Sequence, residues 1–144
     1  MVFRNSLEKR VLLRKFIKEK RLVRTPVTVD TLSALLIEKM GFEAIALGGY
    51  PTSGSLLGLP DIGLLTMTEV VDNCRRVANV TNIPLIIDAD NGYGGVPNVC
   101  RAVRELENAG ASAIVIEDQV WPKRCGHMAG KAIVETSEFI LHET

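Results

Sequence analysis

Three continuous apolar segments recur along the chain, and each ends in glycines or acidic residues. They read FEAIALGG at 42–49, IPLIIDAD at 83–90 and ASAIVIEDQ at 111–119. Strands of a parallel sheet covered on both faces show such unbroken apolar runs instead of alternation. A shorter strand is predicted over residues 27–32, where β-branched side chains follow Pro26. The pattern therefore predicts four parallel strands.

Amphipathic segments with helical periodicity fill the intervals between these strands. Helices are predicted at residues 1–21, 32–40, 66–81 and 96–110, and from residue 136 onward. The third begins at a threonine N-cap, Thr66 or Thr68, and the second and fourth end at glycines. Residues 50–63 are rich in glycine, serine and proline and are predicted to form a loop. A helix followed by four strand–helix units is typical of an α/β fold.

The amino-terminal segment is basic, but it lacks the continuous apolar core and the cleavage site of a signal peptide. Its apolar positions follow helical spacing at Leu7, Val11, Leu12, Phe16 and Ile17. A mitochondrial presequence is the less favoured alternative, because Glu8 and Glu19 interrupt the positive charge. A cytoplasmic location is therefore predicted.

The overall composition excludes several classes of function. Of 144 residues, 17 are Lys or Arg and 17 are Asp or Glu, so the formal net charge is zero. That balance gives no support to binding of nucleic acid or of an anionic membrane. No apolar run is long enough to span a bilayer. The three cysteines do not indicate a disulfide framework, which favours a reducing compartment; Cys74 and Cys100 lie in helical patterns and are expected to be buried.

Acidic residues lie at the expected carboxyl ends of the strands, where parallel α/β folds bind ligands. Asp88 and Asp90 would share one face of a strand and repel each other unless a cation lies between them. Alternatively, Asp90 caps the turn that follows. Hard oxygen ligands favour Mg²⁺ or Mn²⁺ over Zn²⁺. Glu117 ends the neighbouring strand, about 5 Å away, and would join this site or form a salt bridge with Lys123 or Arg124.

A cysteine lies among basic residues in the loop that follows the last strand. Lys123, Arg124 and His127 surround Cys125 and would favour its thiolate. From this spacing alone, a reactive and a structural cysteine are equally supported. Asp61 follows a proline in a predicted loop and is by itself best explained as a turn residue.

Three segments together resemble the isocitrate lyase and phosphoenolpyruvate mutase superfamily. They are GGYPTSGSLLGLPDIG at 48–63, DADNGYGG at 88–95 and IEDQVWPKRCGHMAGK at 116–131, in the order found in that family. KRCGH resembles the signature of the lyase branch, whose cysteine is catalytic and is generally missing from the phosphonate-forming mutases. The resemblance implies a (β/α)8 TIM-type barrel that forms homo-oligomers. Because such a barrel takes roughly 250 residues, residues 1–144 are expected to form its first half as one partial domain.

The resemblance also implies roles for particular residues. The implied metal ligands, for Mg²⁺ with Mn²⁺ as the alternative, are Asp61, Asp88, Asp90 and Glu117. The residues implied to bind a small carboxylic acid substrate are Gly48, Gly49, Tyr50, Lys123 and Gly126. The implied catalytic residues are Cys125, Glu117 and His127. Many lyases of the family carry a serine where this chain has Gly48, so Ser53 or Ser55 is an alternative substrate residue.

The function implied by the resemblance is that of a Mg²⁺-dependent carbon–carbon lyase. It would cleave a 2-hydroxy di- or tricarboxylate, such as methylisocitrate or dimethylmalate, into a 2-oxo acid and a second carboxylate. Three alternatives remain open: an oxaloacetate hydrolase, a phosphonate-forming mutase of the same superfamily, and a half-barrel without catalytic activity.

Overall fold

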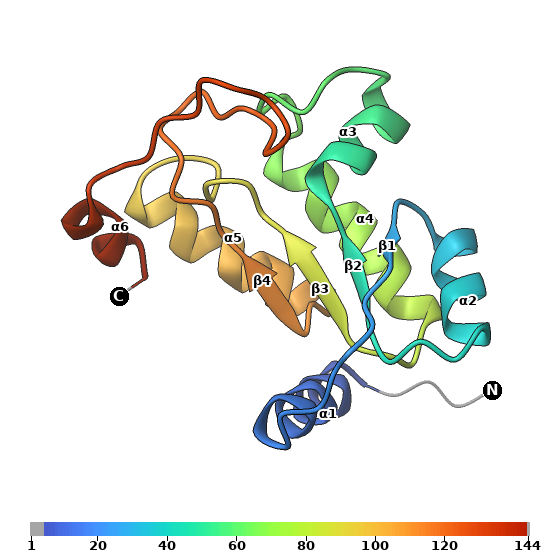
Figure 1. Cartoon of the computed structure of the whole chain (residues 1–144). Helices are drawn as coiled ribbons and strands as arrows, with labels where there is room; N and C mark the ends of the chain where they lie inside the picture. Colours follow the sequence, from blue (N-terminus) through green and yellow to red (C-terminus); the bar gives the residue numbers. More distant parts are fainter. Residues whose placement is uncertain (1–4, 144) are drawn as a thin grey trace.

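The sheet consists of four short parallel strands in the order in which they occur along the chain. The computed structural model describes residues 5–143, without the side chains at 138 and 141–143. Its strands are β1 (Val27–Thr28), β2 (Ile45–Leu47), β3 (Leu85–Asp88) and β4 (Ala113–Val115). Ala46 pairs with Ile86, and Ile87 pairs with Ile114. The parallel α/β architecture predicted from the apolar runs is confirmed (Figure 1).

Helices cover the sheet and close one of its ends. They are α1 (Ser6–Lys18), α2 (Thr31–Lys39), α3 (Gly49–Leu57), α4 (Met67–Val80), α5 (Val96–Ala109) and α6 (Thr136–Glu143). In Figure 1, α1 crosses the end at which the strands begin, whereas α3 and the long loop after β4 lie beyond the opposite end. Helices α2, α4 and α5 pack side by side along the sheet. The carboxyl ends of the strands therefore face α3 and that loop.

Two predicted helix boundaries agree with the structure. Thr66 caps α4, and Glu69 reciprocates by accepting a hydrogen bond from the Thr66 backbone N–H, so that two N–H groups at the helix start are satisfied. Gly110 ends α5 in the left-handed conformation, with φ of 109°, which glycine adopts without steric penalty. Local sequence signals were sufficient at both places.

The first strand is shorter than predicted, because the helix after it begins early. β1 ends at Thr28, and the Asp30 carboxylate accepts a hydrogen bond of 2.8 Å from Ser33 N. An aspartate in this position satisfies an N–H group that has no partner within the helix. The prediction of a strand over residues 27–32 was wrong in its second half, where α2 begins.

A helix, α3, occupies much of the segment predicted to be a loop. Pro51 lies in its first turn, where a missing N–H is tolerated. Gly58 ends the helix with φ of 65°. The Ser53 hydroxyl is buried and donates a hydrogen bond of 3.0 Å to Leu59 O, so this alternative substrate residue is engaged within the fold. The glycine and serine content of residues 50–63 concealed the helix.

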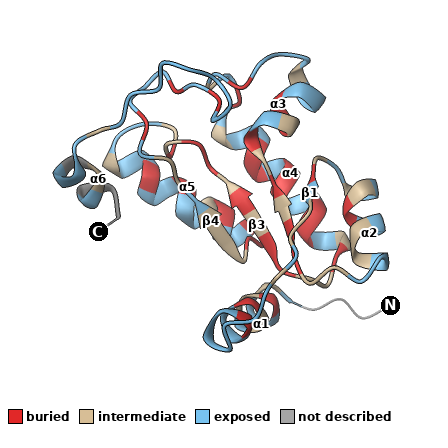
Figure 2. Cartoon of the chain, in the orientation of Figure 1, coloured by how far each residue is buried: buried red, intermediate tan, exposed pale blue. Residues whose placement is uncertain are grey.

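The hydrophobic core lies between the sheet and helices α4 and α5. Figure 2 shows buried residues along β2 and β3 and on the helix faces next to them. Cys74 belongs to this core and is fully buried, as predicted. Cys100 is exposed, and the prediction that it is buried was wrong because it lines an open cleft between α5 and β4. The main core side chains are Ile45, Leu47, Val77, Leu85, Ile87 and Leu106.

Helix α1 docks through a face that includes a buried lysine. Leu13 and Phe16 are buried, whereas the predicted apolar positions Leu7 and Val11 are exposed. Lys9 Nζ donates a hydrogen bond of 2.6 Å to Ala78 O at the end of α4. Burial lowers the pKa of Lys9. In the described part of the chain, no helix is both long and apolar enough to cross a membrane.

Truncation of a core side chain on α5 tests this packing. Leu106 is fully buried, so we expect Leu106→Ala to lower the free energy of unfolding by about 2–5 kcal/mol. Val103 lies on the same helix and is 37% exposed, and Val103→Ala is the matched control, with an expected loss of about 0.5 kcal/mol. Urea denaturation followed by circular dichroism measures both. Equal losses in the two variants would contradict the described core.

Candidate active site

The segments at the carboxyl ends of the strands enclose a cleft of about 500 Å³. Residues from α3, from the ends of β3 and β4 and from the loop after β4 form its walls. Most of the residues singled out from the sequence line it, namely Gly48, Gly49, Tyr50, Asp61, Asp88, Glu117, Cys125, Gly126 and His127. The other two, Asp90 and Lys123, are buried and contact each other. The topology thus brings together residues from three distant segments of the chain.

Lys123 lies in the centre of an acidic cluster. Its Nζ is 2.8 Å from Asp61 Oδ1 and also forms an ion pair with Asp90 Oδ1. All three residues are buried, at 1%, 6% and 4% exposure for Lys123, Asp61 and Asp90. Asp61 is therefore more than the turn residue that its local sequence indicated. The ammonium group was expected next to the Cys125 thiol, but its ion-pair partners are these two carboxylates.

Asp88 organises the backbone around the cleft. Its Oδ2 accepts a hydrogen bond of 2.9 Å from Gly49 N, and its Oδ1 accepts one of 3.1 Å from Asp90 N. The first bond satisfies the N–H group at the start of α3, where negative charge is favourable. A Cβ atom at Gly49 would lie 2.9 Å from Asp88 Oδ2, so only glycine permits this close approach.

Asp90 reaches the cluster through a turn. β3 ends at Asp88, and Asp90 has a left-handed backbone with φ of 50°. The turn is closed by a hydrogen bond of 2.9 Å from Gly92 N to Ala89 O. The strand alternation that was used to place both carboxylates on one face does not extend to Asp90. A left-handed aspartate is uncommon, and such outliers concentrate at functional sites.

Burial and mutual repulsion shift the ionisation of the cluster. Burial, together with the neighbouring Asp88 and Asp61, raises the pKa of Asp90 to about 6, although Lys123 opposes this shift. Burial also raises the pKa of Glu117. Burial disfavours the Lys123 ammonium, but its hydrogen bonds to Asp61 and Asp90 outweigh this effect and raise its pKa. The carboxylates outnumber the ammonium group, so the cluster favours a further positive charge.

The donor set suits a hard divalent cation. Mg²⁺ and Mn²⁺ bind carboxylate oxygens, and Asp61, Asp88 and Asp90 carry such oxygens in the cleft or behind its wall. In the described residues, however, no group of three or more His, Cys, Asp or Glu side chains is arranged around a common point as a metal requires. Asp61 and Asp90 are paired with the Lys123 ammonium group instead. The chemistry of these carboxylate oxygens fits such a metal, and the cation paired with Asp61 and Asp90 in this structure is the Lys123 ammonium group.

The Cys125 thiol lies in the wall of the cleft beside a histidine. Its Sγ is 3.5 Å from His127 Nδ1, and the His127 ring lies 6.0 Å from the Tyr50 ring. Cys125 is 5% exposed. Lys131 Nζ donates hydrogen bonds of 2.7 and 2.8 Å to Gly126 O and Met128 O, which hold this part of the loop. The thiol is therefore held at the surface of the cleft, within reach of a small ligand.

Gln119 is a site residue that sequence reasoning missed. Its Nε2 donates hydrogen bonds of 2.7 Å to Glu117 Oε2 and 2.8 Å to Arg124 O, and its Oε1 accepts one of 3.0 Å from Arg124 N. The side chain thus joins the end of β4 to the loop that carries Cys125. Glu117 was expected to pair with Lys123 or Arg124 if it did not bind metal, but the bond that it accepts is from Gln119. The available sequence signal was its position two residues after Glu117, because residues two apart in an extended segment lie on the same face.

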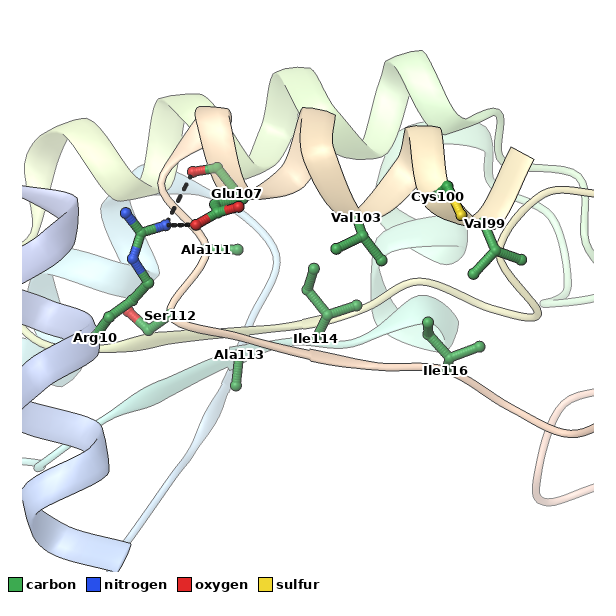
Figure 3. Close-up of a pocket in the computed structure, with 10 residues that line it drawn as sticks. All are labelled: Arg10, Val99, Cys100, Val103, Glu107, Ala111, Ser112, Ala113, Ile114 and Ile116. Carbon is green, nitrogen blue, oxygen red and sulfur yellow. Dashed lines mark hydrogen bonds and ion pairs between the residues drawn. The ribbon is translucent and has the colours of Figure 1, made fainter. Parts of the chain in front are cut away.

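A second cleft, of about 630 Å³, lies between β4 and α5 and reaches α1 at one end. Figure 3 shows Ile114 and Ile116 facing Val99 and Val103 of α5, with an ion pair of 3.0 Å between Arg10 and Glu107 at one end. Its walls are mainly apolar, and β4 pairs with β3 alone among the described strands. This cleft contains none of the residues singled out as catalytic, so the smaller cleft at the strand ends is the candidate active site.

Removal of the Gln119 amide tests its hold on the loop. We expect Gln119→Leu to increase the rate at which iodoacetamide alkylates Cys125 several-fold, because three hydrogen bonds to the loop and to Glu117 are lost. The background is Cys100→Ser, since Cys100 is exposed and Cys74 is fully buried with its pKa raised to about 12. Mass spectrometry of the labelled peptide gives the rate. Asp118→Asn, at an exposed neighbour, is the control, and equal rates in all three proteins would contradict the role of Gln119.

Comparison with known proteins identifies the family. Residues 13–141 match the model of the family described as phosphoenolpyruvate phosphomutase. The chain is 47% identical to the petal death protein of Dianthus caryophyllus, over 94% of this chain and 43% of that protein. It is 44% identical to the 2,3-dimethylmalate lyase of Eubacterium barkeri, over 89% of this chain and 44% of that enzyme. It is also 44% identical to the 2-methylisocitrate lyase of Aeropyrum pernix, over 96% of this chain and 45% of that enzyme. The chain thus spans less than half the length of these relatives.

Solved structures agree with this assignment. Oxaloacetate acetylhydrolase in complex with 3,3-difluorooxalacetate aligns with a TM-score of 0.89 and 34% identity, over 93% of this chain and 46% of that structure. Phosphonopyruvate hydrolase in complex with oxalate and Mg²⁺ aligns with a TM-score of 0.84 and 35% identity, over 93% of this chain and 45% of that structure. The four strands correspond to about half of a TIM-type barrel, as predicted. The chain belongs to the phosphoenolpyruvate phosphomutase family, within the superfamily that also contains the isocitrate lyases.

Proposed function

We propose that this chain carries the metal site and the acid–base group of a Mg²⁺-dependent carbon–carbon lyase. The substrate class is a 2-hydroxy di- or tricarboxylate of the methylisocitrate or dimethylmalate type. The observation that carries the proposal is one cleft lined by the start of α3, by three carboxylates and by a thiol beside a histidine. A fourth carboxylate, Asp90, is linked to Asp61 of this cleft through Lys123. Because the chain spans less than half of its relatives, the activity itself is part of the proposal, as are homo-oligomer formation and a cytoplasmic location.

The start of α3 is the proposed binding place for one substrate carboxylate. Gly48 is the N-cap and has no side chain to cap the helix. Asp88 Oδ2 accepts the hydrogen bond of Gly49 N, so the Tyr50 N–H is the backbone group proposed to meet the substrate. Helix starts attract anions because their N–H groups lack partners within the helix. Gly48, Gly49 and Tyr50 would contact the carboxylate, and Gly126 would approach from the opposite loop.

Asp61, Asp88, Asp90 and Glu117 are the proposed metal ligands, directly or through water. Mg²⁺, when bound there, would stabilise negative charge that develops on substrate oxygen. The charge imbalance of the cluster supports this role, as does the Mg²⁺ and oxalate complex of the similar phosphonopyruvate hydrolase. Mn²⁺ has the same ligand preference and is the alternative ion.

The proposed reaction is a retro-aldol cleavage in which protons are moved by residues of the cleft. Glu117, a half-buried carboxylate with a raised pKa, would accept the proton of the substrate hydroxyl. The hydroxyl carbon then becomes the carbonyl of the 2-oxo acid, and the electrons of the broken C–C bond pass to the carbon beside the second carboxylate. The Cys125 thiol would donate its proton to that carbon, with His127 orienting the sulfur.

An oxaloacetate hydrolase is the second candidate, supported by the structural match to oxaloacetate acetylhydrolase. It would release oxalate and acetate, whereas the lyase would release a 2-oxo acid and a second carboxylate. A phosphonate-forming mutase is less favoured, because Cys125 supplies a proton donor for which such a reaction has no evident use.

Ligand-induced stabilisation tests the metal and carboxylate sites together. We expect Mg²⁺ with oxalate to raise the Tm of the chain, because a ligand at 100 times its Kd stabilises the folded state by about 2.7 kcal/mol. Asp90→Asn should abolish the shift, since it removes a proposed ligand. Asp72→Asn, at an exposed aspartate paired with Arg75, is the control and should retain it. Differential scanning fluorimetry measures the shift, and an equal shift in both variants would place the metal elsewhere.

Product analysis tests the chemistry. With Mg²⁺ and 2-methylisocitrate or 2,3-dimethylmalate, we expect a 2-oxo acid to appear in a coupled dehydrogenase assay. Cys125→Ser should slow its formation by about 10²–10⁴-fold, the usual contribution of a positioned acid or base. Cys100→Ser, at the exposed cysteine, should leave it unchanged. Oxalate and acetate formed from oxaloacetate would favour the hydrolase, and the absence of every product would reject catalysis by this chain.

A further inference from the structure

We propose that Lys123 is an internal counter-ion that occupies the cation position of the acidic cluster and leaves it when a metal ion binds. This inference rests on the metal site of the proposed function and adds a second state to it. The ammonium group contacts Asp61 Oδ1 at 2.8 Å and forms an ion pair with Asp90 Oδ1. The Lys123 side chain is completely shielded from solvent, and those of Asp61 and Asp90 are 8% and 6% exposed.

The same carboxylate oxygens cannot hold both cations in these positions. Mg²⁺ binds oxygen at about 2.0–2.1 Å, and an ammonium nitrogen bound to the same atoms would lie within a few ångströms of the ion. Two positive charges so close together repel strongly in a buried site. Binding of a metal between Asp61 and Asp90 therefore requires Nζ to move away.

The structure indicates where the released side chain would go. Lys123 lies two residues before Cys125, on the loop whose backbone Gln119 fixes at Arg124. Asp61 lines the substrate cleft while also contacting Nζ, so the ammonium group lies just behind the cleft wall. The flexible four-carbon stem of lysine permits a change of rotamer without a change of backbone. In the released state, Lys123 would face the cleft and meet a substrate carboxylate.

This exchange reconciles two observations about Lys123. The family resemblance implies that Lys123 contacts the substrate, whereas in the structure its ammonium group pairs with Asp61 and Asp90. The two positions become two states of one residue, with the metal selecting between them. Metal would then bind first and make available the cation that binds the substrate.

Metal affinity in a Lys123 variant tests the exchange. Lys123→Met retains the length of the stem and removes the charge, so metal no longer competes with an ammonium group. We expect its Kd for Mn²⁺, measured by electron paramagnetic resonance of the free ion, to be at least about tenfold lower than that of the unaltered chain, a difference of about 1.4 kcal/mol. Arg124→Met, at the exposed neighbouring cation, is the control and should leave the Kd unchanged.

A measurement on the unaltered chain covers the case in which the variant does not fold. Brief acetylation followed by peptide mass spectrometry reports the access of reagent to each lysine. Lys123 should be protected without metal and should react when Mg²⁺ is added, whereas the exposed Lys39 should react equally in both.

The outcomes separate this inference from the proposed function. If metal binds, but Lys123→Met binds it no more tightly than the unaltered chain and Lys123 stays protected at saturating Mg²⁺, the exchange is overturned and the metal site stands. If neither the unaltered chain nor Lys123→Met binds Mn²⁺, the metal site fails and the exchange fails with it. Tighter binding by the variant, or labelling of Lys123 induced by Mg²⁺, supports the exchange.

Discussion

Parallel pairing of consecutive strands is the constraint on which the candidate site depends. Each strand runs in the same direction, so the segments that follow β2, β3 and β4 all emerge at one end of the sheet. Residues separated by as many as 100 positions along the chain, such as Val27 and His127, thereby line the same cleft.

Buried charge is the second determinant of the site. Burial of carboxylates without partners is highly unfavourable, and Lys123 offsets part of this penalty by pairing with Asp61 and Asp90. Asp88 is satisfied instead by backbone N–H groups, one of them at the start of α3. The cluster thus combines structural and chemical roles: the same carboxylates that suit a metal also fix the helix start and the loop around them.

The loop after β4 is held by side-chain to backbone hydrogen bonds more than by apolar packing. Gln119 and Lys131 supply most of these bonds, and the nearby Trp121 and Val120 remain largely exposed. Such a loop presents Cys125 and His127 at defined positions while the rest of its surface is open. The apolar cleft beside β4 (Figure 3) shares no lining residue with the cleft that holds this chemistry.

The sequence by itself determined the fold class, because unbroken apolar runs and glycine-terminated helical segments depend on local periodicity and conformational preference. It also identified nearly all the residues that line the cleft, through their position at strand ends and through three family motifs. Only the tertiary structure decided how these residues pair. Lys123 lies two residues from Cys125 in sequence, yet its partners are Asp61 and Asp90, because electrostatic attraction acts between groups that the fold brings together. The turn at Asp90 and the hydrogen bonds of Gln119 are local in sequence, but only the fold shows that this turn brings Asp90 to Lys123 and that Gln119 holds the loop beside the cleft.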